Sequence, residues 1–117
     1  MTIPDILGIK TFLKKIDELL LNREDKVLRE VVNSSDIDYI VKVLETLPRG
    51  RKKTFGMLKP DRAARVLTKL SPYLRQYVLR EASLERVLGI IDFLESDEVA
   101  DLINILPLKT KFDVIEQ

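Results

Sequence analysis

The chain of 117 residues is long enough for one domain with its own core and too short for two ordinary domains. Its residues are 45% hydrophobic and 33% charged, a balance that is typical of folded soluble proteins, and five prolines argue against a long coiled coil. The formal net charge of +1 gives no overall field toward nucleic acid or an anionic membrane.

The sequence contains neither Cys nor His, so disulfides, thiolate ligands and the commonest general base are excluded. A bound metal would need oxygen ligands, which favours hard cations such as Mg²⁺. The N-terminal residues lack the pattern of a signal peptide, and no apolar run approaches the roughly 18 residues that span a bilayer. We therefore expect a chain without a signal peptide that does not itself insert into a membrane.

Two helices are predicted in residues 1–33. Apolar residues at helical spacing predict a helix from Ile3 to Leu21, and a second helix is expected from about Arg23 to Val32. We interpret residues 1–33 as an N-terminal helical cap and residues 34–117 as a series of short-helix repeats. Together they are expected to form a single domain over residues 1–117.

A short apolar pattern recurs about every twelve residues in the repeat region. Each copy has one or two adjacent apolar residues and another three positions later, as in Val66, Leu67 and Leu70. This i, i+3, i+4 spacing marks one face of an α-helix. The closing residues of the six copies are Leu47, Leu58, Leu70, Ala82, Leu94 and Leu106.

Helix-start signals fall between these copies. A proline follows the closing residue at positions where it suits the first turn of a new helix. These prolines are Pro48, Pro60, Pro72 and Pro107. Polar residues that suit the N-cap position are Asp36, Ser71, Ser83 and Ser96.

The pattern predicts an all-α fold, a right-handed-type superhelix or solenoid of short antiparallel helices that repeat about every twelve residues. Such short helices cannot bury themselves alone, so neighbouring helix pairs must pack on one another. The residues that we expect to share one core are Leu67, Leu70, Leu79, Ile91, Leu94 and Leu102.

Three stretches resemble the N-terminal cytosolic domain of MgtE-type magnesium transporters. Residues 27–31 (VLREV) resemble the opening of that family's repeat region, and residues 60–67 (PDRAARVL) resemble its proline-initiated helix with an Ala-Ala step. Residues 97–102 (DEVADL) resemble its acidic signature. The similarity runs from about residue 27 to residue 107.

The resemblance implies a cytosolic regulatory domain that senses intracellular Mg²⁺. In that family the domain docks on CBS domains when Mg²⁺ is abundant and thereby helps to close a membrane pore. The implied partners are CBS domains and a pore of the same or a partner chain, and a homodimer could form through the parent protein. The implied cofactor is Mg²⁺, bound weakly and only at the interface.

Asp97, Glu98 and Asp101 are the candidate metal ligands. They fall within the first turn and a half of a predicted helix, at spacings that bring like charges close together. A divalent cation would convert that repulsion into attraction. The same residues also suit a helix N-terminus without any metal, because acidic side chains complement the helix dipole. Both interpretations stay open on the sequence.

A basic cluster is the candidate surface for an acidic partner. Its residues are Arg49, Arg51, Lys52, Lys53, Arg62 and Arg65. Arg65 departs from the resemblance, because an acidic residue is common at that place in the family. The alternative is a solvated face with no partner. No aromatic residues interleave with these cations, so nucleic acid is not expected.

An enzymatic role is not expected, because the four glycines form no phosphate loop and the commonest catalytic bases and nucleophiles are missing. The alternative function is a protein–protein interaction scaffold without metal, related to the superhelical domains of flagellar motor-switch proteins.

Overall fold

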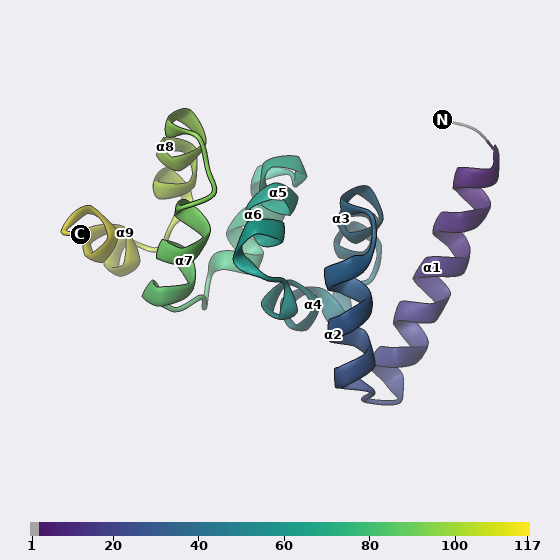
Figure 1. Cartoon of the computed structure of the whole chain (residues 1–117). Coiled ribbons are helices and arrows are strands. Elements are labelled where there is room, and N and C mark those ends of the chain that lie inside the picture. Colours follow the sequence, from purple (N-terminus) through teal and green to yellow (C-terminus); the bar gives the residue numbers. More distant parts are fainter. Residues whose placement is uncertain (1–2) are drawn as a thin grey trace. The chain divides into compact units, whose positions relative to one another are not determined.

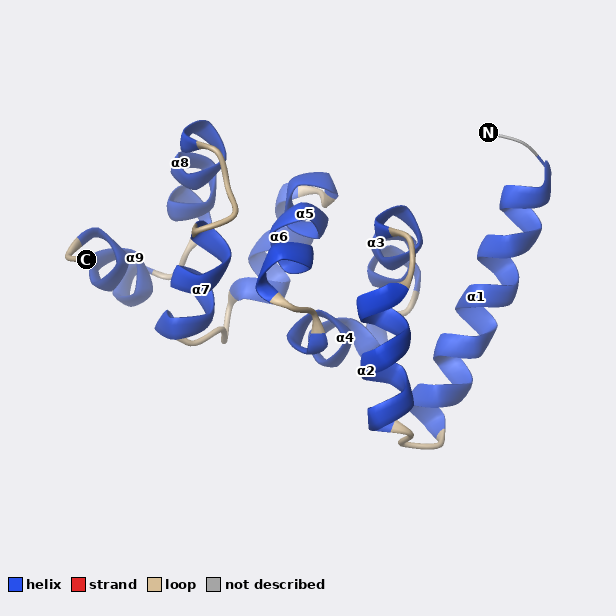
Figure 2. Cartoon of the chain, viewed as in Figure 1, coloured by secondary structure: helices blue, strands red, loops and turns tan. Residues whose placement is uncertain are grey.

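The computed structural model describes the backbone of residues 3–117 and the side chains from Gly8 onward. These residues form nine α-helices and one short 3₁₀ helix, joined by brief turns (Figures 1 and 2), and contain no strand. The all-α prediction is therefore confirmed. The helices are α1 (Ile3–Leu21), α2 (Asp25–Ser34), α3 (Ile37–Thr46), η1 (Pro48–Gly50), α4 (Arg51–Met57), α5 (Pro60–Lys69), α6 (Pro72–Leu79), α7 (Leu84–Ile91), α8 (Ser96–Ile105) and α9 (Leu108–Ile115).

The twelve-residue repeat is visible in the backbone hydrogen bonds. At every twelfth position a backbone N–H donates to the carbonyl three residues earlier, with N–O distances of 3.0–3.3 Å. The donors are Leu58, Leu70, Ala82, Leu94 and Leu106. A tight turn of this kind satisfies carbonyls at the end of a helix, so the repeated apolar residue also marks where a helix stops.

Three of the four predicted N-caps are confirmed. The Asp36 carboxylate accepts from the backbone N–H of Asp38 at 2.8 Å, and the Ser71 and Ser83 hydroxyls accept from N–H groups three residues ahead. The prediction for Ser96 is wrong, because Glu95 is the N-cap of α8 and Ser96 is its first helical residue. Glu98 makes this possible, since its carboxylate accepts from the Glu95 backbone N–H at 2.8 Å.

Prolines begin three of the helical segments as predicted. Pro48, Pro60 and Pro72 occupy the first turn, whereas Pro107 is the N-cap of α9. A missing N–H costs nothing at these places, because the first N–H groups of a helix have no partner within it.

The turn between α1 and α2 explains why the second helix starts later than predicted. Arg23 has a φ of 55°, in the left-handed region, so it cannot be the first residue of α2. Its N–H donates to Leu20, and the N–H of Glu24 donates to Leu19, the pattern of a Schellman motif. The chain then enters α2 at Asp25.

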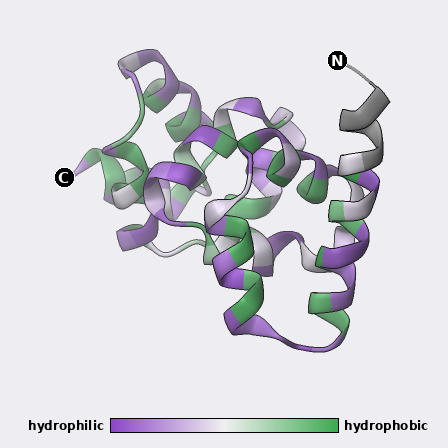
Figure 3. Ribbon diagram, turned by 45° about the vertical axis from the view of Figure 1, so that its right-hand side comes forward, coloured by the Kyte–Doolittle hydropathy of each residue, from purple (hydrophilic) through white to green (hydrophobic). Residues whose placement is uncertain are grey.

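Residues up to Leu58 form one compact unit. Within its described part, α1 packs on α2 and α3, and α4 packs on the same two helices. Figure 3 shows hydrophobic and hydrophilic residues alternating around these helices, as expected for amphipathic segments. The fully buried side chains at the centre of this unit include Ile16, Leu28, Val32, Ile40 and Leu44.

Residues 59–117 form the second compact unit. Here α5 packs on α7, α7 on α9, and α6 on α8, so each helix contacts the second helix along the chain. A two-helix repeat predicts this order of contacts. The superhelical course of the whole chain, its right-handed sense and the single-domain assignment stay predictions.

The core prediction for the second unit is partly confirmed. Leu67, Leu70, Leu79 and Leu102 are buried. The remaining two predicted core residues, Ile91 and Leu94, are only half-buried.

On α7 the buried residues are Val87 and Ile90, three positions apart. Adjacent helical residues point about 100° apart, and the packed face of α7 is centred on Val87 and Ile90, which leaves Ile91 at its edge. Leu94 lies beyond the end of α7, where it lines a cavity.

Thr54 provides a prediction about stability. Its side chain is fully buried in α4, and its hydroxyl has no hydrogen-bond partner among the residues that the structure describes. A buried hydroxyl without a partner costs roughly 1–3 kcal/mol. Thr54→Val is therefore expected to raise the free energy of unfolding by about 1 kcal/mol, measured by urea denaturation.

Thr68→Val is the matched control, because the Thr68 hydroxyl is exposed and donates to the Arg65 carbonyl at 2.8 Å. Its effect should stay within about 0.5 kcal/mol. A loss of stability in Thr54→Val would mean that the hydroxyl has a partner such as a buried water.

Candidate functional site

The three predicted metal ligands lie at the start of α8. Asp97 and Asp101 are exposed, whereas Glu98 is half-buried. The Glu98 carboxylate already accepts the backbone N–H of Glu95, so it contributes to the start of the helix. This supports the structural interpretation for Glu98 and leaves Asp97 and Asp101 as the freer oxygen donors.

These carboxylates do not converge on one point. Among the side chains that the structure describes, no three acidic residues lie close enough together to hold a metal ion. Mg²⁺ prefers six oxygen ligands in near-octahedral geometry. The described side chains therefore offer at most part of a coordination sphere.

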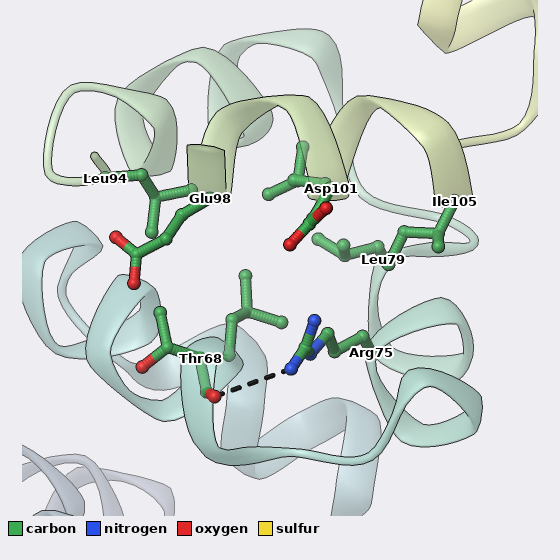
Figure 4. Close-up of a pocket in the computed structure, with 9 residues that line it drawn as sticks. Thr68, Arg75, Leu79, Leu94, Glu98, Asp101 and Ile105 are labelled. Carbon is green, nitrogen blue, oxygen red and sulfur yellow. Dashed lines mark hydrogen bonds between the residues drawn. The ribbon is translucent and has the colours of Figure 1, made fainter. Parts of the chain in front are cut away.

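A cavity of about 180 Å³ lies beside the acidic start of α8. Glu98 and Asp101 lie on one side of it, and Thr68 and Arg75 lie on the opposite side (Figure 4). The remaining walls are apolar and come from Leu67, Leu79, Leu94, Leu102 and Ile105. The cavity is about as large as one that accepts a benzene molecule.

Arg75 determines the electrostatics of this cavity. Its guanidinium donates to the Leu70 carbonyl at 2.9 Å and to the Thr68 carbonyl at 3.4 Å, at the end of α5. These bonds hold a positive charge opposite Glu98 and Asp101 (Figure 4). This positive charge offsets part of the negative charge that Glu98 and Asp101 bring to the cavity.

The residues of the predicted basic cluster come from both compact units. Arg49 lies in η1, and Arg51, Lys52 and Lys53 lie on α4, in the first compact unit. Arg62 and Arg65 lie on α5, in the second unit. Arg49, Lys52, Lys53 and Arg65 are exposed, and Arg62 is half-buried.

Arg51 is not a free surface cation. It is half-buried, and its guanidinium donates to the carbonyls of Leu44 at 2.5 Å and Glu45 at 2.9 Å. These carbonyls belong to the last turns of α3, where a positive charge is favoured by the helix dipole. Arg51 therefore bonds within its own chain through Nε and one Nη nitrogen, and its role in binding a partner stays a prediction.

A groove that was not predicted brings Arg23 together with two residues of the basic cluster in the first unit. Its volume is about 640 Å³, and Lys53 and Arg49 line it together with Arg23, the residue with the positive φ. Lys53 also pairs with Asp25 at 2.6 Å. The other lining residues are Asp17, Leu20, Leu21, Leu47 and Pro48. Arg23 was missed because it is distant in sequence from the basic run and only the fold brings it near.

A second missed feature is the use of basic side chains to end helices. Arg51 binds the end of α3, Arg75 binds the end of α5, and Lys111 donates to the Asn104 carbonyl of α8 at 3.4 Å. In each case the donor follows the carbonyl by five to seven residues. A basic residue at that distance after a helix end is a signal that could be sought in sequence.

No helix in residues 3–117 combines the length and apolarity that a bilayer crossing requires. No curated protein and no solved structure shows significant similarity to the chain. A family model, that of the MgtE intracellular N domain, matches residues 35–117, which is more than half of the chain. The match takes in α3 to α9, close to the repeat region assigned above, and leaves out α1 and α2. By this match, the chain belongs to the family of MgtE intracellular N domains.

Proposed function

We propose that this chain is an intracellular regulatory domain of a magnesium transporter, without catalytic activity of its own. It would dock on CBS domains of the same or a partner chain and so influence whether the membrane pore conducts. Family membership over residues 35–117 supports a role in magnesium transport. The observation that carries the finer proposal is the exposed pair Asp97 and Asp101 at the start of α8, within the matched segment.

Asp97 and Asp101 supply two negative charges whose mutual repulsion a divalent cation would reduce. They are four residues apart, on the same side of α8, so their charges repel each other. Pressed against a second acidic surface they would repel it as well. Mg²⁺ at such an interface offsets that repulsion, usually while keeping several of its water ligands. The proposed contact therefore forms when Mg²⁺ is abundant and separates when Mg²⁺ falls.

The chain alone should bind Mg²⁺ weakly. Glu98 is engaged at the helix start, and Arg75 places a positive charge across the cavity from Asp101. We expect a dissociation constant of about 1 mM or weaker for the isolated chain, equivalent to about 4 kcal/mol or less of binding free energy. Isothermal titration calorimetry with MgCl₂ measures it.

The decisive experiment adds the second surface. The chain is studied together with its CBS-domain partner by limited proteolysis across a Mg²⁺ titration. We expect protection to increase with Mg²⁺ in the unmodified protein. Asp97→Asn combined with Asp101→Asn should weaken that response without unfolding α8, because asparagine keeps the shape and removes the charge.

Asp61→Asn is the matched control. Asp61 is the second residue of α5, as Asp97 is of α8, and it lies outside the candidate ligand set. This variant should respond to Mg²⁺ like the unmodified protein. Digestion patterns that do not change with Mg²⁺ would sink the sensor proposal and favour a metal-independent scaffold.

A further inference from the structure

The last helix, α9, exposes an apolar stripe. Leu108, Phe112 and Ile115 are 66%, 56% and 62% exposed. Their i, i+4, i+7 spacing places them on one face of the helix. Val114 on another face is buried where α9 packs on α7 and α8. The helix therefore has one apolar face covered by its own chain and a second one exposed.

The charges of α9 run against its own dipole. Lys109 lies in the first turn, and Glu116 follows the last residue with helical dihedral angles. An isolated helix prefers the opposite order, with acidic residues at its start and basic residues at its end. This arrangement slightly destabilises α9 taken alone.

An antiparallel second copy of α9 would complement both features. In an antiparallel helix pair, residues on the same side of the apolar stripe face each other, and the start of one helix lies beside the end of the other. Lys109 and Glu116 lie on the same side of the stripe, so each lysine would face the glutamate of the second copy. Along the stripe, Leu108 would meet Ile115, and the two Phe112 rings would meet near the twofold axis.

We propose that α9 is a self-association surface through which two copies of this chain pair antiparallel about a twofold axis. Such a contact is isologous, so one helix supplies both halves of the interface. Lys111 would come close to its counterpart at the axis, but its ammonium is directed to the Asn104 carbonyl of its own chain. The contact is made by this chain itself and requires neither Mg²⁺ nor CBS domains.

The size of α9 sets the expected strength. Eight residues of α-helix are about 12 Å long. The buried area should thus be near or below the roughly 1,000 Å² of a stable interface, which predicts a dissociation constant of about 0.1 mM. Sedimentation velocity across a concentration series that spans this value is the primary measurement.

Reciprocal charge changes test the antiparallel register. Lys109→Glu and Glu116→Lys each place like charges at both contacts, and each should weaken dimerisation at least about tenfold. Mixed in equal amounts, the two variants should associate again, because each contact then joins a carboxylate to an ammonium. A parallel pair, or a partner of another kind, would not predict this recovery.

Phe112→Ser tests the stripe. Removing two large apolar side chains from the interface should weaken association by about a hundredfold. Tyr73→Ser is the control, because Tyr73 is a 68% exposed aromatic residue on α6, away from the stripe. It should dimerise like the unmodified chain, and far-UV circular dichroism should confirm that every variant stays folded.

A chain that remains monomeric at 1 mM, about ten times the expected dissociation constant, would overturn the proposal. Equal dimerisation of the charge variants and the unmodified chain would also overturn it, as would failure of the mixed variants to associate.

Discussion

Replacing Leu79 with alanine is expected to lower the free energy of unfolding by about 2–5 kcal/mol, the range for a buried leucine. Leu79 is the last residue of α6 and is only 1% exposed. Leu79 also lines the cavity beside α8, so its truncation enlarges that space unless the surrounding side chains collapse into it. A domain of this size has about 5–15 kcal/mol of stability in total, so the loss is a large part of it. Urea denaturation followed by far-UV circular dichroism measures the change.

Leu94→Ala is the matched comparison. Leu94 borders the same cavity as Leu79, but it is half-buried rather than fully buried. We expect a loss of about 1–2 kcal/mol, less than a fully buried leucine, because less apolar area leaves water on folding. If both variants lost the same free energy of unfolding, the half-buried Leu94 side chain would contribute as much to stability as the fully buried Leu79, against this prediction.

Helix positions were predictable because three independent signals agree in register. The apolar spacing, the prolines and the N-capping side chains repeat together, and each acts within one or two turns of the chain. The predicted range of α1 matches the structure at both ends. Local signals of this kind need no knowledge of the distant residues, which is why they can be read from sequence alone.

The errors occur where two local signals compete or where a turn is unusual. Ser96 and Glu95 are both able to cap α8, and Glu98 decides the outcome by bonding to the Glu95 N–H. Arg23 adopts a left-handed conformation that glycine or asparagine usually takes. The residue type at this position therefore gave no sign that α2 starts later than predicted. Which of Ile90 and Ile91 faces the core depends on how α7 is rotated against α5 and α9.

The candidate site was predictable only in part, for a related reason. Sequence spacing places Asp97 and Asp101 on one side of a helix, and the structure agrees that both are exposed. The sequence spacing could not reveal that Arg75, more than twenty residues earlier, contributes a positive charge to the cavity that Asp101 lines. That contact depends on the packing of α6 against α8. The spacing of residues along the sequence shows which of them share one side of a helix. It does not show which residues of another helix pack against that side.

Arg51→Met is expected to lower the free energy of unfolding by about 1–3 kcal/mol, because it removes charged hydrogen bonds from the end of α3. Methionine keeps much of the apolar stem of arginine, so the change tests the guanidinium rather than its packing. The Leu44 and Glu45 carbonyls would lose donors that lie at 2.5 and 2.9 Å. The bond to Leu44 is part-buried, so water replaces it poorly.

Arg49→Met separates this effect from a general loss of positive charge. Arg49 lies two residues earlier and is exposed, and its replacement should change stability by no more than about 0.5 kcal/mol. Arg51→Lys should fall between the two, because an ammonium cannot present the fixed fork of donors that reaches two carbonyls together. The urea midpoint should therefore be highest for Arg49→Met, intermediate for Arg51→Lys and lowest for Arg51→Met. If Arg51→Met and Arg49→Met unfold at the same urea concentration, the hydrogen bonds from Arg51 do not stabilise the end of α3.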